Sequence, residues 1–332
     1  MVRTFLYIFF LNNLFGSSQE PTFLVFNHFD KFTPVQGDFY KPLNNVEFKS
    51  QINERLSADE TYDYILEKKC QITGNMHDRH KVRWVKAFFL KNFFQNFAKL
   101  NQNLPYYVNI LLHSLLIFLT LIFLNKSFNL EDKHILFFLL YISYVFQNHL
   151  GEYSYSIFEM FFVSVAIFAS KNKKILLLIV VSTLAVLNRE SGMLIPFIWL
   201  VFNKDLKKVI ICLATITIIF IIVNWHLISC ILNPKFFIPM EYQGGQINFS
   251  DIVSINIISL VKLFLINFII PFGIIFYNYV KYNSQNKFLL GLTVIYILMF
   301  LFATPLHHLA VRLIILPIIV LSFYLGREEK IN

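Results

Sequence analysis

The stretch Leu187-Asn188-Arg189-Glu190-Ser191-Gly192 decides how this chain is built, because it places two charged residues between two short apolar runs. The first run covers residues 175–187 and the second covers residues 193–202. At about 1.5 Å of rise per residue, neither run crosses a hydrocarbon core of roughly 30 Å. Ionisable groups at such a depth are costly and usually functional. The stretch therefore predicts a re-entrant or half-length helical hairpin whose charged tip faces a water-filled cavity.

The rest of the chain is strongly apolar, with 56% hydrophobic residues among 332. This composition and the recurring apolar segments predict a single all-α integral membrane domain over residues 1–332, a polytopic transmembrane helical bundle. About ten membrane segments are expected, some of them short or re-entrant. The first covers residues 5–11, and the others cover residues 106–124, 133–147, 156–170, 175–187, 193–203, 209–231, 253–279, 288–304 and 309–325.

Basic residues in the short loops predict the orientation through the positive-inside rule. With Arg3 taken as cytoplasmic, one face carries 13 lysines and arginines and the other carries only 3, which are Arg189, Lys235 and Arg312. Both termini are then expected in the cytoplasm, and the Arg189-Glu190 tip on the outer face of an inner membrane. The net charge of +9 does not indicate a nucleic-acid partner, because the basic residues are spread over these loops.

Residues 16–105 form a long polar segment, which we expect to be an extracytoplasmic loop after the first helix. In its last part, residues 81–100, the apolar side chains recur at spacings of three and four and therefore share one helical face. This pattern predicts either an amphipathic helix in the membrane interface or a soluble amphipathic helix that packs on the loop. The apolar run before the loop fits either a cleaved signal peptide or a retained first helix.

Several side chains on the expected outer face are candidates for chemistry. Asp38 could serve as a general base that activates an acceptor hydroxyl, or it could be an ordinary surface carboxylate. Arg189 could bind a phosphate through its planar donors while Glu190 positions it. The alternative for both residues is an internal ion pair, or charges that extend to the interface from a helix end.

Glu159 lies near the start of an apolar run, where a carboxylate is expensive unless it is paired. Its partner could be Arg189 or Arg312. His307 and His308 are adjacent, which makes a poor metal motif, and the three cysteines lack metal-ligand spacing, so no metal site is predicted. Nucleotide-binding, zinc-hydrolase and serine-hydrolase motifs are also absent from the sequence.

Four stretches in this order resemble a known family. They are Gly37-Asp38-Phe39-Tyr40, Asp78-Arg79-His80-Lys81-Val82-Arg83, the pair formed by Tyr155-Ser156-Ile157-Phe158-Glu159 with Leu187 to Gly192, and Val311-Arg312-Leu313. Together they resemble bacterial polytopic membrane proteins of the GT-C glycosyltransferase type, which depend on polyprenyl-phosphate-linked sugars. Histidines stand before Arg312 where an acidic residue often precedes it in that family.

The resemblance implies a glycosyltransferase that takes its sugar from a polyprenyl-phosphate donor at the outer face of the cytoplasmic membrane. It implies that the first helix is retained, that Asp38 is the catalytic base, and that Glu159 and Glu190 position the arginines. Arg83, Arg189 and Arg312 would stabilise the departing lipid phosphate. Some relatives use a divalent cation, and nothing in the sequence decides this. The alternative is a non-catalytic membrane protein that binds or translocates lipid-linked glycans.

Overall fold

The computed structural model describes residues 104–147 and 154–225 and, outside these ranges, Val85, Gly273, Tyr277 and residues 290, 291 and 293–295. Its elements are all helices, and the described residues contain no strand. The expected all-α class is therefore confirmed for this part of the chain. Asp38, Arg83 and Arg312 lie outside the described residues, as do the first apolar run, nearly all of the long segment 16–105 and most of the chain after residue 225.

The described helices belong to two compact units. The larger set, which we call the α8–α11 unit, contains most of α6 (Leu104–Phe128) and of α8 (Ser154–Lys171). It also contains α9 (Ile175–Asn188), the 3-10 helix η4 (Glu190–Phe197), α10 (Ile198–Asn203) and α11 (Leu206–Val223). The other unit contains α7 (Asp132–Gln147).

The predicted apolar segments match the first four helices closely and differ at two later places. The expected segment 193–203 is a 3-10 helix followed by a short α-helix, with Pro196 inside the 3-10 part. Proline lacks the N–H that a regular α-helix needs in its interior. The expected segment 209–231 is interrupted at Asn224, whose side-chain nitrogen donates to the Phe220 carbonyl at 2.9 Å and ends α11. Asparagine favours such local bonds over continued helix.

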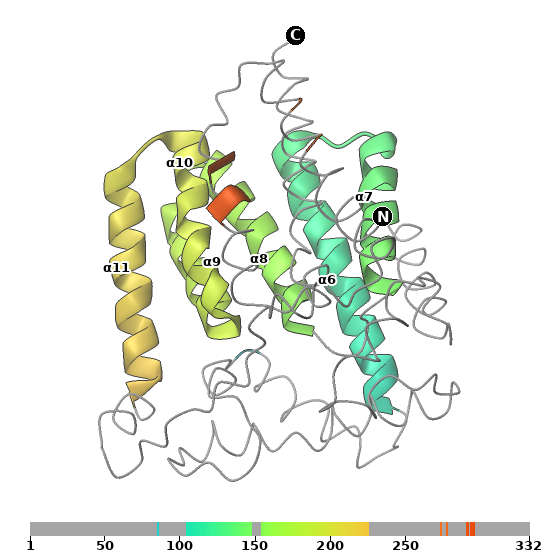
Figure 1. Ribbon diagram of the computed structural model, residues 1–332, viewed down its shortest axis with the longest axis horizontal. Coiled ribbons are helices and arrows are strands. Elements are labelled where there is room, and N and C mark those ends of the chain that lie inside the picture. The colour runs from blue at the N-terminus through green and yellow to red at the C-terminus, as the bar shows by residue number, and fades with distance from the viewer. Residues whose placement is uncertain are drawn as a thin grey trace, which may run out of the picture. The chain divides into compact units, whose positions relative to one another are not determined.

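α8 forms the core of its unit, because its side chains from Ile157 to Ser170 are nearly all buried. A helix that is apolar all round belongs in such an interior. Phe123 of α6 packs edge-on against two rings of α8, at centroid distances of 5.9 Å from Phe161 and 5.4 Å from Phe168. On the other flank, α9 contacts both η4 and α11. Figure 1 shows the ribbon of this unit, with α11 at its edge.

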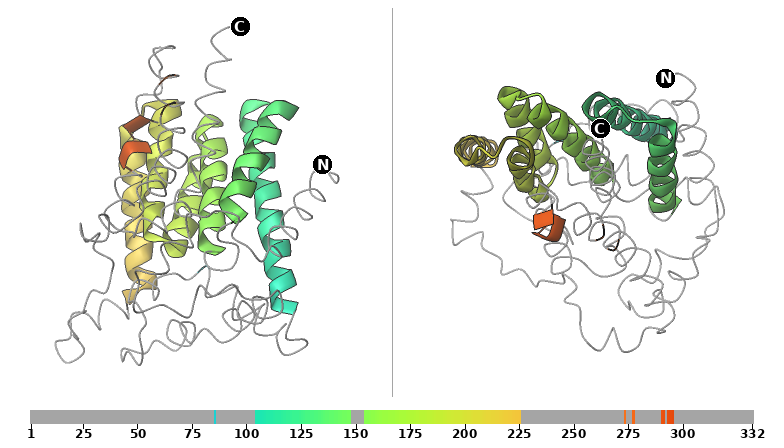
Figure 2. Two further views of the ribbon diagram at one scale, coloured as in Figure 1. Left: turned by 45° about the vertical axis from the view of Figure 1, so that its right-hand side comes forward. Right: turned by 90° about the horizontal axis from the view of Figure 1, so that it is seen from above.

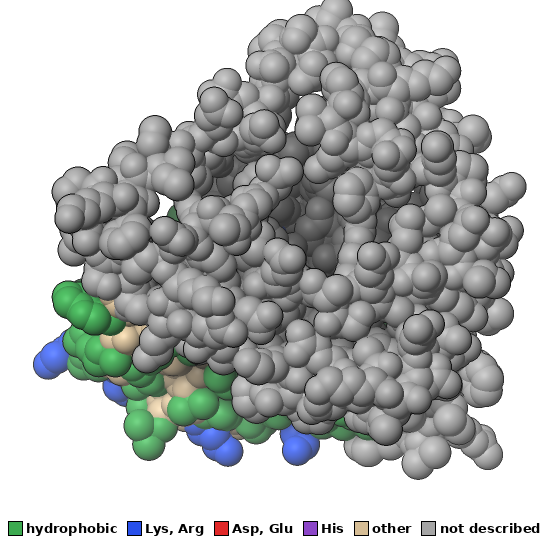
Figure 3. Space-filling model, turned by 90° about the horizontal axis from the view of Figure 1, so that it is seen from below, with side chains coloured by type: hydrophobic (Ala, Val, Ile, Leu, Met, Phe, Trp, Pro, Cys, Tyr) green, Lys and Arg blue, Asp and Glu red, His purple; other side chains and the backbone are tan. Residues whose placement is uncertain are grey.

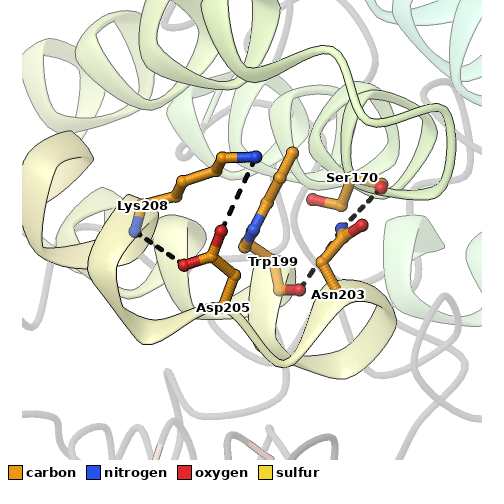
Figure 4. Close-up of polar contacts among 5 residues, drawn as sticks. All are labelled: Ser170, Trp199, Asn203, Asp205 and Lys208. Atoms are coloured by element: carbon orange, nitrogen blue, oxygen red, sulfur yellow. Dashed lines mark hydrogen bonds and ion pairs between the residues drawn. The ribbon is translucent and has the colours of Figure 1, made fainter.

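The helices of the α8–α11 unit alternate in direction along the chain. A tight turn at residues 172–174 reverses α8 into α9, and residues 204–205 reverse α10 into α11. The Asn203 side chain donates to the Ser170 carbonyl at 2.8 Å, so the ends of α8 and α10 meet (Figure 4). Both turns therefore lie at one end of the unit, and the junction of α9 with η4 lies toward the other (Figures 1 and 2).

Two described helices are long and apolar enough to cross a membrane, over Leu111–Phe128 and Leu206–Val223. The second differs from the core helix of a soluble protein, since only 17% of its window is buried. Ile210, Ile218 and Ile222 are each more than half exposed. Such a helix suits contact with lipid better than contact with water. Figure 3 shows, in the described part of one face, hydrophobic side chains beside a few lysines or arginines. This pattern supports the expected membrane protein.

Candidate functional site

The candidate site lies at the break between α9 and η4, where the sequence predicted the tip of a hairpin. α9 ends at Asn188, and Arg189 takes an extended conformation with φ −164° and ψ 146°. Its N–H still donates to the Ala185 carbonyl at 2.8 Å, and its carbonyl accepts from the Gly192 N–H at 2.9 Å. The backbone groups at the break are thus bonded on both sides. The helix is thus broken at Arg189, and η4 begins at the next residue.

Gly192 allows η4 to approach α9 closely after the break. A Cβ atom at this position would lie 2.4 Å from the carbonyl carbon of Ala185 and 2.4 Å from the backbone nitrogen of Val186. These are backbone atoms of α9, so they cannot move aside as a flexible side chain would. The absence of a side chain at Gly192 is therefore what lets the chain fold back against the helix it has just left.

The carboxylate of Glu159, on α8, joins the two sides of the break. Its Oε2 lies 2.9 Å from Nη1 of Arg189, and its Oε1 accepts a hydrogen bond from Oγ of Ser191. The side chains of Arg189 and Glu159 are only 2% and 3% exposed. A buried charge needs a partner and further hydrogen bonds to offset its lost hydration. Glu159 therefore holds the residues on either side of Glu190 to the core helix.

The break comes at the end of a helix, α9, that is shorter than its neighbour α11. α9 has 14 residues and α11 has 18. At about 1.5 Å per residue they extend about 21 Å and about 27 Å, respectively. Both helices start from turns at the same end of the unit. Measured from these turns, α9 therefore reaches Arg189 over a shorter length than α11 needs to reach its own end.

The structure brings together two of the six predicted site residues, Glu159 and Arg189. The sequence left Arg189 and Arg312 as possible partners of Glu159, and the structure shows an ion pair with Arg189. Glu190 begins η4, and its side chain is outside the described part, as are Asp38, Arg83 and Arg312. Ser191 was not predicted as a site residue although it contacts Glu159. The signal in the sequence was a small hydroxyl residue two positions after an arginine between apolar runs. That pattern alone does not indicate which residue the hydroxyl contacts.

Residues 104–147 and 154–225, with the few other described positions, hold no cluster of three or more histidine, cysteine, aspartate or glutamate side chains that could bind a metal ion. The groups that meet at the break are one carboxylate, one guanidinium and one hydroxyl.

This sequence was also compared with protein families, with curated proteins and with solved structures. No family model, curated protein or solved structure matches it.

Proposed function

We propose that this protein is an integral membrane glycosyltransferase of the GT-C type, which transfers a sugar from a polyprenyl-phosphate donor at the outer face of the cytoplasmic membrane. The order of the four sequence stretches supports this proposal, and so do the helical fold and the exposed apolar face of α11. The proposal includes about ten membrane segments and a long outer loop after the first helix.

The observation that carries the proposal is the Glu159–Arg189 ion pair at the break after α9. It holds a buried guanidinium at the end of the unit away from the lysine-bearing turns. By the positive-inside rule those turns face the cytoplasm, so the break faces the outer side. A fixed guanidinium at that end suits the phosphate of a lipid whose polyprenyl chain lies in the membrane, because arginine donors bind phosphate bidentately.

In the proposed reaction, an acceptor hydroxyl oxygen forms a bond to the anomeric carbon of the sugar while Asp38 takes the hydroxyl proton. The bond from the anomeric carbon to the phosphate oxygen breaks, and the polyprenyl phosphate leaves with the electron pair. Arg189, together with Arg83 and Arg312, stabilises the negative charge that develops on the phosphate. Glu159 acts as a positioning residue, because it holds Arg189 in place and does not itself contact the reacting atoms in the proposed reaction. Glu190 is proposed to have the same role.

The test is sugar transfer by the purified protein in lipid nanodiscs. The donors are polyprenyl-phosphate-linked hexoses that carry a radiolabel, and the acceptors are cell-envelope glycans. We expect the wild type to transfer label to acceptor, and Asp38→Asn to lose transfer by at least about a hundred-fold, as general-base removal typically does. Asp38→Asn should still bind polyprenyl phosphate. Undiminished transfer by Asp38→Asn would contradict the assigned chemistry.

A second candidate function is a non-catalytic protein that binds or translocates lipid-linked glycans. One observation favours it. In the buried site, Glu159 already balances the charge of Arg189, and such a stable pair can shape a binding surface without taking part in a reaction. The nanodisc experiment separates the two functions. A carrier leaves the donor intact, and its lipid binding is the same in the wild type and in Asp38→Asn.

A further inference from the structure

We propose that the two turns at the lysine-bearing end of the α8–α11 unit form one binding surface for the headgroups of anionic phospholipids. This lysine surface consists of residues 171–174 and 204–208, which contain six lysines and a single acidic residue, Asp205. The lysines are Lys171, Lys173, Lys174, Lys204, Lys207 and Lys208. The inference concerns the membrane around the protein and does not depend on the proposed glycosyl transfer.

The two turns form one surface because they are bonded to each other. Asn203 directly precedes the second turn, and its side chain donates to the carbonyl of Ser170, directly before the first, at 2.8 Å. Figure 4 shows this bond beside the indole of Trp199. Lys208 Nζ lies 5.3 Å from the centre of the Trp199 ring and 3.6 Å from a carboxylate oxygen of Asp205. The position of each turn is thus fixed by the other.

Local stability does not account for every lysine on this surface. Lys173 and Lys204 have positive φ angles of 55° and 52°, a conformation that favours glycine. Lys174 is the N-cap residue of α9, and Lys207 is in the first turn of α11. The helix dipole disfavours a positive charge at both of these N-terminal positions. An anionic partner on this surface would account for the charges of Lys174 and Lys207, which the helix dipoles do not favour.

Several lysines of this surface are not neutralised by the residues that the structure describes. Lys173, Lys204 and Lys207 are exposed, and none of them forms an ion pair with another described residue. Lys174 is held differently, with its Nζ 5.3 Å from the centre of the Phe168 ring. The Lys208 charge is matched by Asp205. The surface therefore presents several fixed positive charges to the membrane interface.

Exposed apolar side chains begin directly beside the lysines, and they identify the partner as a lipid. On α9, Leu176 is 77% exposed and Val180 is 55% exposed, and on α11 Leu206 is 55% exposed. A soluble acidic protein or a nucleic acid would bind the charges but leave these apolar side chains in water. A phospholipid satisfies both features, because its anionic headgroup meets the lysines while its acyl chains cover the apolar faces.

The test compares lipid retention by the full-length protein in nanodiscs that contain equal amounts of phosphatidylglycerol and phosphatidylcholine. Native mass spectrometry counts the lipids that stay bound. The variant carries Lys173→Gln, Lys174→Gln, Lys204→Gln and Lys207→Gln together. Its matched control carries Lys41→Gln, Lys49→Gln, Lys68→Gln and Lys69→Gln, which remove the same charge from the long segment 16–105.

We expect the wild type and the matched control to retain phosphatidylglycerol in preference to phosphatidylcholine. The preference should fall at least about ten-fold in the surface variant, because each lysine near an anionic surface contributes about five-fold to binding. An unchanged preference in the surface variant would overturn the proposal. Lack of preference in the wild type would overturn it as well, so the test holds even if the variant does not fold. Replacing the same four lysines by arginine should keep the preference.

Discussion

Glu159 of α8 and Arg189 at the end of α9 form a buried ion pair, with 2.9 Å between Oε2 and Nη1, and they lie 30 positions apart in the chain. Ser191 occupies the other oxygen of the same carboxylate. The three side chains tie the break after α9 to the core helix of the unit. The break is therefore a defined element of the fold, which the following predictions examine.

Removing either charge of the pair should destabilise the protein strongly. Glu159→Leu or Arg189→Met leaves the other charge buried with its partner lost, which costs about 3–5 kcal/mol. The double variant Glu159→Leu with Arg189→Met removes both charges, so it should lose less stability than either single variant. Denaturant titration of the protein in detergent measures the free energy of unfolding of each variant in this double-mutant cycle. Additive losses would show that the two side chains do not interact.

Gly192→Ala should separate η4 from α9. The new Cβ would lie 2.4 Å from backbone atoms of Ala185 and Val186, so one element must shift, at a cost of about 1–3 kcal/mol. Gly291→Ala is the matched control, because a Cβ there meets nothing within 4 Å and alanine favours a helix. The same denaturant titration compares them. Equal stabilities for the two variants would refute the close approach.

Single cysteines should locate the two ends of the α8–α11 unit on opposite sides of the membrane. In a variant without native cysteines, Asn172→Cys lies in the turn between α8 and α9, and Trp225→Cys lies just beyond α11. We expect a membrane-impermeant maleimide to label Trp225→Cys from outside the cell and Asn172→Cys only in inverted vesicles. Labelling of both from one side would exclude the proposed orientation.

The turn before α7 gives a prediction about pH. Glu131 Oε2 lies 2.9 Å from Lys133 Nζ, and this hydrogen bond and the positive charge lower the pKa of the Glu131 carboxyl below its ordinary value of 4.5. A lowered pKa in the folded state contributes stability above the unfolded-state value, and this contribution is lost as the pH falls through the folded-state pKa. Lys133→Met should raise the pKa toward 4.5, as a carbon-13 NMR titration of the carboxyl would show. An unchanged pKa would mean that Lys133 is not its cause.

The sequence was sufficient to predict the short α9 and the break at Arg189, because apolar run length and charge position determine both. It left the partner of Glu159 open between Arg189 and Arg312. That choice depends on how α8 is rotated about its axis relative to a residue 30 positions away, which local periodicity does not specify. The contact from Ser191 was missed for the same reason. The 3-10 form of η4 was not predicted either, although Pro196 signals in the sequence a departure from a regular α-helix.

The most direct test of the central proposal compares the binding of polyprenyl phosphate with that of polyprenol, the same lipid without its phosphate. Native mass spectrometry of the purified protein measures both, for the wild type and for the double variant Glu159→Leu with Arg189→Met. If the buried pair serves a lipid phosphate, the wild type binds polyprenyl phosphate at least about ten-fold more tightly, and the folded double variant loses most of that preference. Equal binding of the two lipids by the wild type, or an unchanged preference in the double variant, would contradict the proposal.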